Sequence, residues 1–202
     1  MTASDPTLSP DPMLALKSQL REAALARRDE MPAEARAAAG EAIAARALPV
    51  AVSPGMIVSG FMPIRSELNP LPLLRRFADA GAELALPAVA GRGRPLIMRA
   101  WSFGAPLERQ QWGIREPAAD AATVAPDILI VPLAAFDQRG YRIGYGAGYY
   151  DLTLAALRAV KSVTAIGVGY AAQEIDEVPV LPHDQRLDLV LTECGVIDCR
   201  GA

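Results

Sequence analysis

Short apolar segments alternate with longer segments of helical pattern along most of this chain. An apolar run of about four to eight residues that is bounded by turn residues is typical of a buried strand. The clearest example is DILIVPLAA at residues 127–135. The sequence predicts strands at residues 56–61, 83–89, 96–101, 127–135, 163–168 and 187–192.

Helical patterns fill most of the intervals between these strands. Asp11 followed by Pro12 is typical of a helix start, because the carboxylate caps the first turn and proline fits the first helical position. Residues 102–126 show little periodicity and many prolines and small residues, so we expect mainly loop there. The sequence predicts helices at residues 13–29, 32–48, 71–80 and 149–160.

The alternation of strands and helices predicts a layered α/β fold with a mostly parallel central sheet flanked by helices. At 202 residues the chain is long enough for one domain with a substantial core. We expect this single domain at residues 13–202. The polar, proline-rich stretch at residues 1–12 is expected to be a flexible lead.

Composition and charge argue against some classes of function. The chain is 51% hydrophobic and 21% charged, which is typical of a globular protein. Its formal charge of −3 argues against binding of nucleic acid over a broad surface. No apolar run approaches the roughly 18 residues typical of a membrane span. The N-terminus lacks the basic-then-apolar layout of a signal peptide, so we expect a cytoplasmic protein, acting as a monomer.

Residues 142–151, RIGYGAGYYD, contain the most informative local motif. Gly144, Gly146 and Gly148 allow the backbone to approach a ligand closely, and successive N–H groups in such a loop can bind an anion. A helix that begins directly after the glycines would add free N–H groups and its positive dipole end. Asp151 would repel a bare phosphate unless Mg²⁺ lies between them. These features predict a nucleotide-phosphate site, and the alternative is a glycine-rich turn with two packed tyrosines.

Three basic residues of the first predicted helix fall on nearly one face. Lys17 and Arg21 are four residues apart, and Arg28 follows seven residues later. A solvated charged face is the commonest explanation of such spacing, and the periodicity alone favours it. The alternative is a basic stripe that reaches phosphates presented by another element.

Two further positions are candidate ligand contacts. Glu67 follows the strand predicted at 56–61, and open α/β sheets bind ligands beyond the carboxyl ends of their strands. Glu67 is therefore a candidate polar anchor, and the alternative is a surface acid. Asp184 would be a second Mg²⁺ ligand if the fold brings it near Asp151. His183 is the only histidine, which excludes a cluster of histidine ligands.

Several motifs occur together in an order that is shared with one enzyme family. The most specific is VPLAAFDQRGYRIGYGAGYYD at residues 131–151. The others are Lys17 and Arg21, PIRSE at 63–67, Trp101, Glu116 with Pro117, and LPHDQRLDLVLTE at 181–193. With these motifs, nearly everything after Met13 resembles the 5-formyltetrahydrofolate cyclo-ligases, also called 5,10-methenyltetrahydrofolate synthetases. The α/β fold expected with this resemblance is Rossmann-like.

The resemblance implies the ATP- and Mg²⁺-dependent conversion of 5-formyltetrahydrofolate to 5,10-methenyltetrahydrofolate, with release of ADP and phosphate. ATP would phosphorylate the formyl oxygen, and N10 of the folate would then attack the activated carbon. An amide-like formyl oxygen is a poor leaving group until it is phosphorylated, which explains the need for ATP. Phosphoryl transfer mostly requires alignment and charge neutralisation, so few acid–base residues are needed.

The resemblance also implies roles for individual residues outside the glycine loop. Lys17 and Arg21 would contact the ATP phosphates from the first helix. Glu67 would accept hydrogen bonds from the N–H groups of the pterin, and Met62 would form an apolar wall.

Within and after the glycine loop, the implied contacts overlap. The residues expected to bind ATP are Arg142, Ile143, Gly144, Tyr145, Gly146, Ala147, Gly148, Tyr149 and Tyr150. Those also expected to border the folate are Tyr145, Gly146, Ala147, Gly148 and Tyr149. Arg142 and Tyr149 are the expected catalytic residues, and Asp151 and Asp184 the expected Mg²⁺ ligands.

The glycine loop departs from the family pattern in one respect. Some relatives carry lysine or another basic residue within it, whereas this chain has Tyr145 and Ala147. The phosphate charge must then be met by backbone N–H groups, Arg142, the basic residues of the first helix and Mg²⁺.

Two other classes of function compete with this interpretation. One is a folate- or nucleotide-binding regulator without turnover. Loss of the residues predicted to contact the metal or the phosphates would favour this alternative. The other is a sugar-phosphate isomerase or acyl transferase, which would not depend on ATP.

Overall fold

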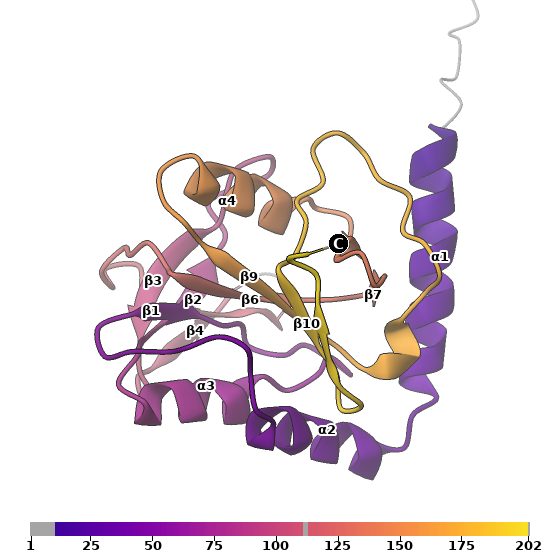
Figure 1. Ribbon diagram of the computed structural model, residues 1–202. Helices are drawn as coiled ribbons and strands as arrows, with labels where there is room; N and C mark the ends of the chain where they lie inside the picture. The colour runs from indigo at the N-terminus through magenta and orange to yellow at the C-terminus, as the bar shows by residue number, and fades with distance from the viewer. Residues whose placement is uncertain (1–10, 111–112, 202) are drawn as a thin grey trace, which may run out of the picture.

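The computed structural model describes residues 11–110 and 113–201, and a seven-stranded sheet runs through this part of the chain (Figure 1). Neighbouring strands are parallel except at the two edges, where the outermost strand is antiparallel. This agrees with the mostly parallel sheet that the sequence predicts. In their order across the sheet, the strands are β11 (Val196–Asp198), β10 (Leu189–Leu191), β9 (Thr164–Val168), β6 (Ile128–Pro132), β1 (Ile57–Ser59), β2 (Glu83–Ala88) and β3 (Ile97–Trp101).

Other elements of the described residues pack around this sheet. The strands of two short antiparallel pairs are β4 (Leu107–Arg109) with β5 (Arg115–Pro117), and β7 (Ala135–Phe136) with β8 (Arg142–Ile143). The helices are α1 (Pro12–Asp29), α2 (Ala33–Ala45), α3 (Leu71–Asp79), α4 (Tyr149–Arg158) and the short 3₁₀ helix η2 (Ala171–Gln173).

Helices cover both faces of the sheet. Alternate residues of a strand point to opposite faces, and β6 shows the consequence directly. Ile128 and Ile130 pack in the core beneath α2 and α3, whereas Leu129 and Val131 pack in the core beneath α4. All four side chains are fully buried. The run of apolar residues in β6 is therefore explained by burial on both faces, as expected for a central parallel strand.

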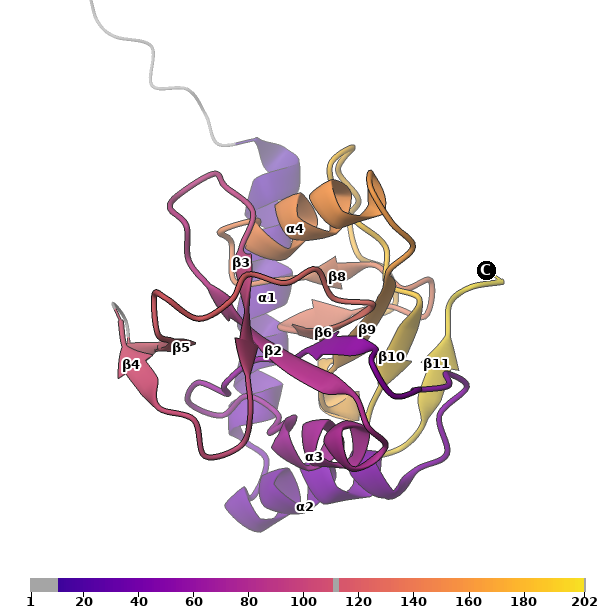
Figure 2. The same ribbon diagram turned by 90° about the vertical axis from the view of Figure 1, so that its left-hand side faces the viewer.

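α1 packs beside the sheet, near the point where β6 leads into β7 (Figures 1 and 2). It covers neither face of the sheet. Its residues Leu20 and Ala24 lie in a small separate core with Ala135, Ile143 and Val178. The helix is thereby fixed beside the chain that follows β6.

The chain leaves the central strands β1 and β6 in opposite directions. From β1 it passes through α3 to β2, and from β6 through α4 to β9, and these two strands lie on opposite sides of the central pair. Neighbouring parallel strands with diverging connections leave a crevice at their carboxyl ends, which is where open α/β sheets bind ligands. The segment with Glu67 follows β1, and the glycine loop comes after β6 and the β7–β8 pair, so both lie beyond the carboxyl ends of the two central strands.

The structure corrects several details of the sequence predictions. The described residues of 102–110 and 113–126 are mainly loop as predicted, except for the strands of the β4–β5 hairpin, which show no apolar run. The strand predicted at 187–192 is not the last, because β11 follows it and pairs with β10. Pro12 already belongs to α1 and not to the lead, and residues 1–10 lie outside the described residues. No helix among the described residues is long and apolar enough to cross a membrane.

Gly40 lies in the interior of α2, where glycine ordinarily weakens a helix by about 1 kcal/mol relative to alanine. A Cβ atom at this position would lie 2.6 Å from the carbonyl oxygen of Asn69. Glycine is therefore needed for α2 to pack this closely against the segment before α3.

We predict that Gly40→Ala lowers the free energy of unfolding by about 1–3 kcal/mol, because the backbone must move to admit the methyl group. Urea unfolding measures the change. The control is Ala37→Gly at an exposed position of the same helix, which should cost about 1 kcal/mol through helix propensity alone. A more stable Gly40→Ala protein would contradict the packing argument.

Candidate functional site

A cavity of about 640 Å³ lies beside the segment that follows β1. Its lining includes Met62, Glu67 and Arg65 from that segment. The β4–β5 hairpin contributes Arg109 and Arg115, which sequence reasoning missed because it predicted no element there. The cavity thus combines an apolar wall, one carboxylate and three guanidinium groups. Such a lining suits a ligand with N–H donors at one end and anionic groups elsewhere.

The hairpin is held over the sheet by a buried acid. Glu116 on β5 is 6% exposed, and its Oε1 accepts a hydrogen bond from the Val89 N–H at 3.1 Å. Arg109 and Arg115 therefore lie on an anchored element. The Glu116-Pro117 pair noted in the sequence serves this structural purpose.

Glu67 is part-buried and is not the surface acid that was the alternative. Its Oε2 accepts a hydrogen bond from the Ile64 N–H at 2.8 Å. Burial raises the pKa of Glu67 above its ordinary value of 4.5. Hydrogen bonds from Ile64 and from Tyr145, and the charge of Arg28, oppose that rise in pKa.

The glycine loop reaches this carboxylate through Tyr145 and then leads into α4. Gly146 and Gly148 have φ angles of 97° and 67°, in the left-handed region that favours glycine. No side chain caps the N-terminus of α4, so its first N–H groups are available to an anion. A Cβ on Gly144 or Gly148 would meet nothing within 4 Å, which leaves open space beside the backbone.

The basic residues of α1 do not form a solvated face, so the interpretation favoured by periodicity is wrong. Lys17 is 7% exposed and Arg28 is 4% exposed. Arg21 donates from Nε to the carbonyl oxygen of Gly144 at 2.7 Å. Lys17 pairs with Asp184. Because α1 packs beside the glycine loop, its long basic side chains point into the site and not into water.

The two predicted metal ligands lie close together, and each is paired with a cation. Asp151 Oδ1 accepts from Arg142 Nη2 at 2.9 Å and from the Gln185 N–H at 2.9 Å. Asp184, the residue before Gln185, pairs with Lys17. Within the described ranges, no group of three or more acidic, histidine or cysteine residues is arranged to hold a metal ion. The two carboxylates fit Mg²⁺ only if phosphate oxygens complete its coordination, which is the usual situation for this ion.

Arg142 is the most enclosed of the predicted catalytic residues. It is 6% exposed and donates to the Gln185 carbonyl as well as to Asp151. Burial lowers the pKa of Arg142, and the charge of Asp151 opposes this shift. Tyr149 opens α4, and its carbonyl accepts from Thr153 Oγ1 at 2.7 Å.

Two of the residues predicted to bind ATP have side chains in the core. Ile143 is 2% exposed and packs with Ala135 and Val178. Tyr150 packs against the core under α4, and burial raises the pKa of its hydroxyl. These two can contribute only backbone atoms or the edge of a ring to a ligand in the loop. Ala147 is exposed.

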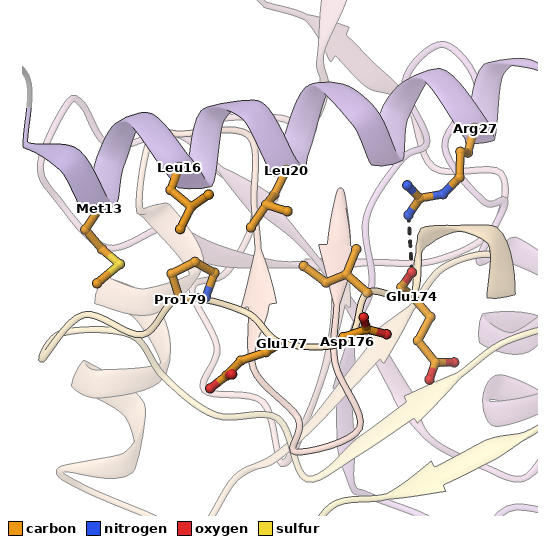
Figure 3. Close-up of a pocket in the computed structure, with 9 residues that line it drawn as sticks. Met13, Leu16, Leu20, Arg27, Glu174, Asp176, Glu177 and Pro179 are labelled. Atoms are coloured by element: carbon orange, nitrogen blue, oxygen red, sulfur yellow. Dashed lines mark hydrogen bonds between the residues drawn. The ribbon is translucent and has the colours of Figure 1, made fainter.

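A second hollow, of about 700 Å³, lies on the other side of α1 (Figure 3). Met13, Leu16 and Leu20 point from the helix toward the segment that contains Glu174 and Pro179. This hollow contains none of the residues predicted to bind a ligand.

The fold and the site define an α/β protein with a glycine loop and an uncapped helix N-terminus beyond the carboxyl ends of β1 and β6. The sequence profile described as the 5-formyltetrahydrofolate cyclo-ligase family matches residues 14–193. The chain therefore belongs to the 5-formyltetrahydrofolate cyclo-ligase family, which is a family of ligases.

Individual relatives agree with this assignment. A 5-formyltetrahydrofolate cyclo-ligase of Mycolicibacterium smegmatis is 35% identical over 193 residues, which cover 91% of this chain and 97% of that protein. One of Escherichia coli is 32% identical over 147 residues, covering 69% and 79%. The NMR structure of Aquifex aeolicus 5,10-methenyltetrahydrofolate synthetase superposes with a TM-score of 0.74 at 30% identity, covering 92% of this chain and 93% of that one.

We predict that Glu67 titrates above 4.5, and that Tyr145→Phe raises its pKa further because a stabilising hydrogen bond to the carboxylate is lost. An NMR titration of the Glu67 side-chain carboxyl carbon measures both values. A ligand that donates N–H groups to ionised Glu67 should therefore be lost as the pH falls through this raised pKa. A Glu67 pKa at or below 4.5 would contradict the burial argument.

Proposed function

We propose that this protein converts 5-formyltetrahydrofolate to 5,10-methenyltetrahydrofolate in a reaction that consumes ATP and requires Mg²⁺. One observation carries the proposal. Glu67, the proposed acceptor of pterin N–H groups, lies close to Tyr145 of the glycine loop, the proposed phosphate site, so that each affects the pKa of the other. A folate on Glu67 and a nucleotide on the loop would therefore be neighbours. Membership of the cyclo-ligase family supports the same conclusion.

The proposed chemistry begins with attack of the formyl oxygen on the γ-phosphorus of ATP. The bond from phosphorus to the bridging oxygen breaks, and ADP leaves. N10 then attacks the phosphorylated formyl carbon and closes the five-membered ring. Loss of phosphate, which carries the former formyl oxygen away, and of the N10 proton gives the methenyl product. The enzyme contributes alignment and charge neutralisation to the first step.

The residues of the site have distinct parts in this scheme. Lys17 and Arg142 exchange their present carboxylate partners, wholly or in part, for phosphate oxygens. Arg21 keeps the loop in place through the Gly144 carbonyl. Asp151 and Asp184 are the protein ligands for Mg²⁺. When bound there, the ion neutralises charge on the transferred phosphoryl group.

An absorbance assay for methenyltetrahydrofolate tests the proposal. Purified protein is given 5-formyltetrahydrofolate with ATP and Mg²⁺, and each of the last two is omitted in turn. Product that requires both is the expected result. Product without ATP would contradict the proposed phosphorylation, and binding of folate and ATP without product would indicate a regulator.

We predict that Asp151→Asn lowers turnover by more than about 100-fold, since replacing a metal ligand should cost more than replacing the groups behind it. The control is Asp176→Asn, at an exposed position beside the second hollow. Thermal melting checks that both variants fold. If Asp151→Asn kept full Mg²⁺-dependent activity, Asp151 would not be a metal ligand.

We predict that Lys17→Ala raises the KM for ATP by about 10- to 100-fold, as expected for loss of a charged hydrogen bond of about 1.5–3 kcal/mol. The KM for the folate should change much less. Lys161→Ala is a matched control, because Lys161 also pairs with an aspartate, Asp127, at 2.6 Å. That pair lies at the amino end of β6, away from the site. Equal effects of Lys17→Ala on both substrates would reject a phosphate contact.

A further inference from the structure

Arg28 is a buried cation to which the proposed reaction gives no part. It lies in the last turn of α1 and is 4% exposed. A buried guanidinium is costly unless it is paired. The carboxylate it contacts is that of Asp29, with an Nε–Oδ1 distance of 3.4 Å, and the Asp29 side chain is 60% exposed. Such a pair is weak, because water competes for the carboxylate.

The shorter contact of Arg28 is with the glycine loop. Its Nη1 donates to the hydroxyl of Tyr145 at 2.7 Å. The hydroxyl oxygen of Tyr145 is thereby an acceptor, and its proton is free to be donated elsewhere. Tyr145 is 46% exposed, so the ring lies at the surface while the hydroxyl reaches a buried partner.

The Tyr145 hydroxyl lies close to the Glu67 carboxylate. Burial raises the pKa of Glu67, and Tyr145 and the charge of Arg28 oppose that rise. Burial and the negative charge of Glu67 raise the pKa of Tyr145, so its hydroxyl keeps its proton. The guanidinium of Arg28, the Tyr145 hydroxyl to which it donates and the Glu67 carboxylate therefore form a chain of neighbouring groups. This chain joins α1, the glycine loop and the cavity beside Glu67.

The glycine loop is held by α1 at two points. Arg21 binds the carbonyl of Gly144, and Arg28, seven residues further along the helix, binds the side chain of Tyr145. Seven residues are about two helical turns, so both arginines project from the same side of α1. The loop between Gly144 and α4 otherwise contains small residues and left-handed glycines, which hold no conformation by themselves.

We propose that Arg28 is a positioning residue: through Tyr145 it holds the glycine loop beside Glu67, at the place where the folate would bind. The inference rests on the proposed function, since it concerns the same folate site.

A double-mutant cycle on folate binding tests this proposal. Isothermal titration calorimetry gives the Kd for 5-formyltetrahydrofolate, without ATP, for the wild type, Arg28→Met, Tyr145→Phe and the double variant. Each single change should weaken binding about tenfold, as for one hydrogen bond to a charged group. Because both residues act through one chain of groups, their effects should not multiply. The Kd of the double variant should be at most about twofold higher than the higher Kd of the two single variants.

The matched control is Arg27→Met, the adjacent position of α1. Arg27 donates to the carbonyl oxygens of Ala172 and Glu174, in the segment that lines the second hollow with α1 (Figure 3). Its replacement should leave the Kd for the folate unchanged. If Arg28→Met lowers the melting temperature, Tyr145→Phe still decides, since it removes only a hydroxyl from a half-exposed side chain.

Two results would overturn the inference alone. The first is a double variant whose Kd for the folate is about 100-fold higher than that of the wild type, because the two single effects multiply. The second is a Tyr145→Phe protein that binds the folate as the wild type does. A wild type that does not bind 5-formyltetrahydrofolate would overturn the proposed function as well.

Discussion

The divergence of the chain at β1 and β6 is the constraint on which the site depends. These parallel neighbours send their connections to opposite sides, so no crossover helix covers their carboxyl ends. The segment with Glu67 and the glycine loop both emerge there. α1, which belongs to neither face of the sheet, then packs beside them and supplies cations. A crevice that arises from topology thus contains a carboxylate, a glycine loop and the cations of α1.

The cations and carboxylates within the site are paired with one another. Lys17 with Asp184 and Arg142 with Asp151 are two neighbouring ion pairs. Burying these cations or these carboxylates without a partner of opposite charge would cost too much free energy of desolvation. A nucleotide with Mg²⁺ presents the same combination, since anionic oxygens can replace the carboxylates at the cations and the metal can replace the cations at the carboxylates. The chain is acidic overall, and yet its basic side chains are concentrated where phosphate would bind.

Sequence reasoning found the parts of this protein that local pattern determines. The apolar runs predicted the central strands, and the spacing of Gly144, Gly146 and Gly148 identified the glycine loop. Gly146 and Gly148 have left-handed backbone conformations, in which a residue with a side chain would be strained. Contacts between residues that are far apart in the chain could not be predicted from local pattern. Arg28 and Tyr145 are 117 positions apart, and nothing in the helical spacing of α1 shows that Arg28 faces a tyrosine and not water. The β4–β5 hairpin was missed because its strands have three residues each and contain charged residues, so they lack an apolar run.

The central claim is that ATP activates the formyl oxygen of a folate bound beside the glycine loop. The most direct test uses 5-formyltetrahydrofolate labelled with ¹⁸O in the formyl group, with ATP, Mg²⁺ and the purified protein. Mass spectrometry of the released phosphate then follows the label. The account predicts that the phosphate carries one ¹⁸O for each methenyl group formed. Unlabelled phosphate, with the ¹⁸O found in water, would show that the formyl oxygen leaves without being phosphorylated and would contradict the account.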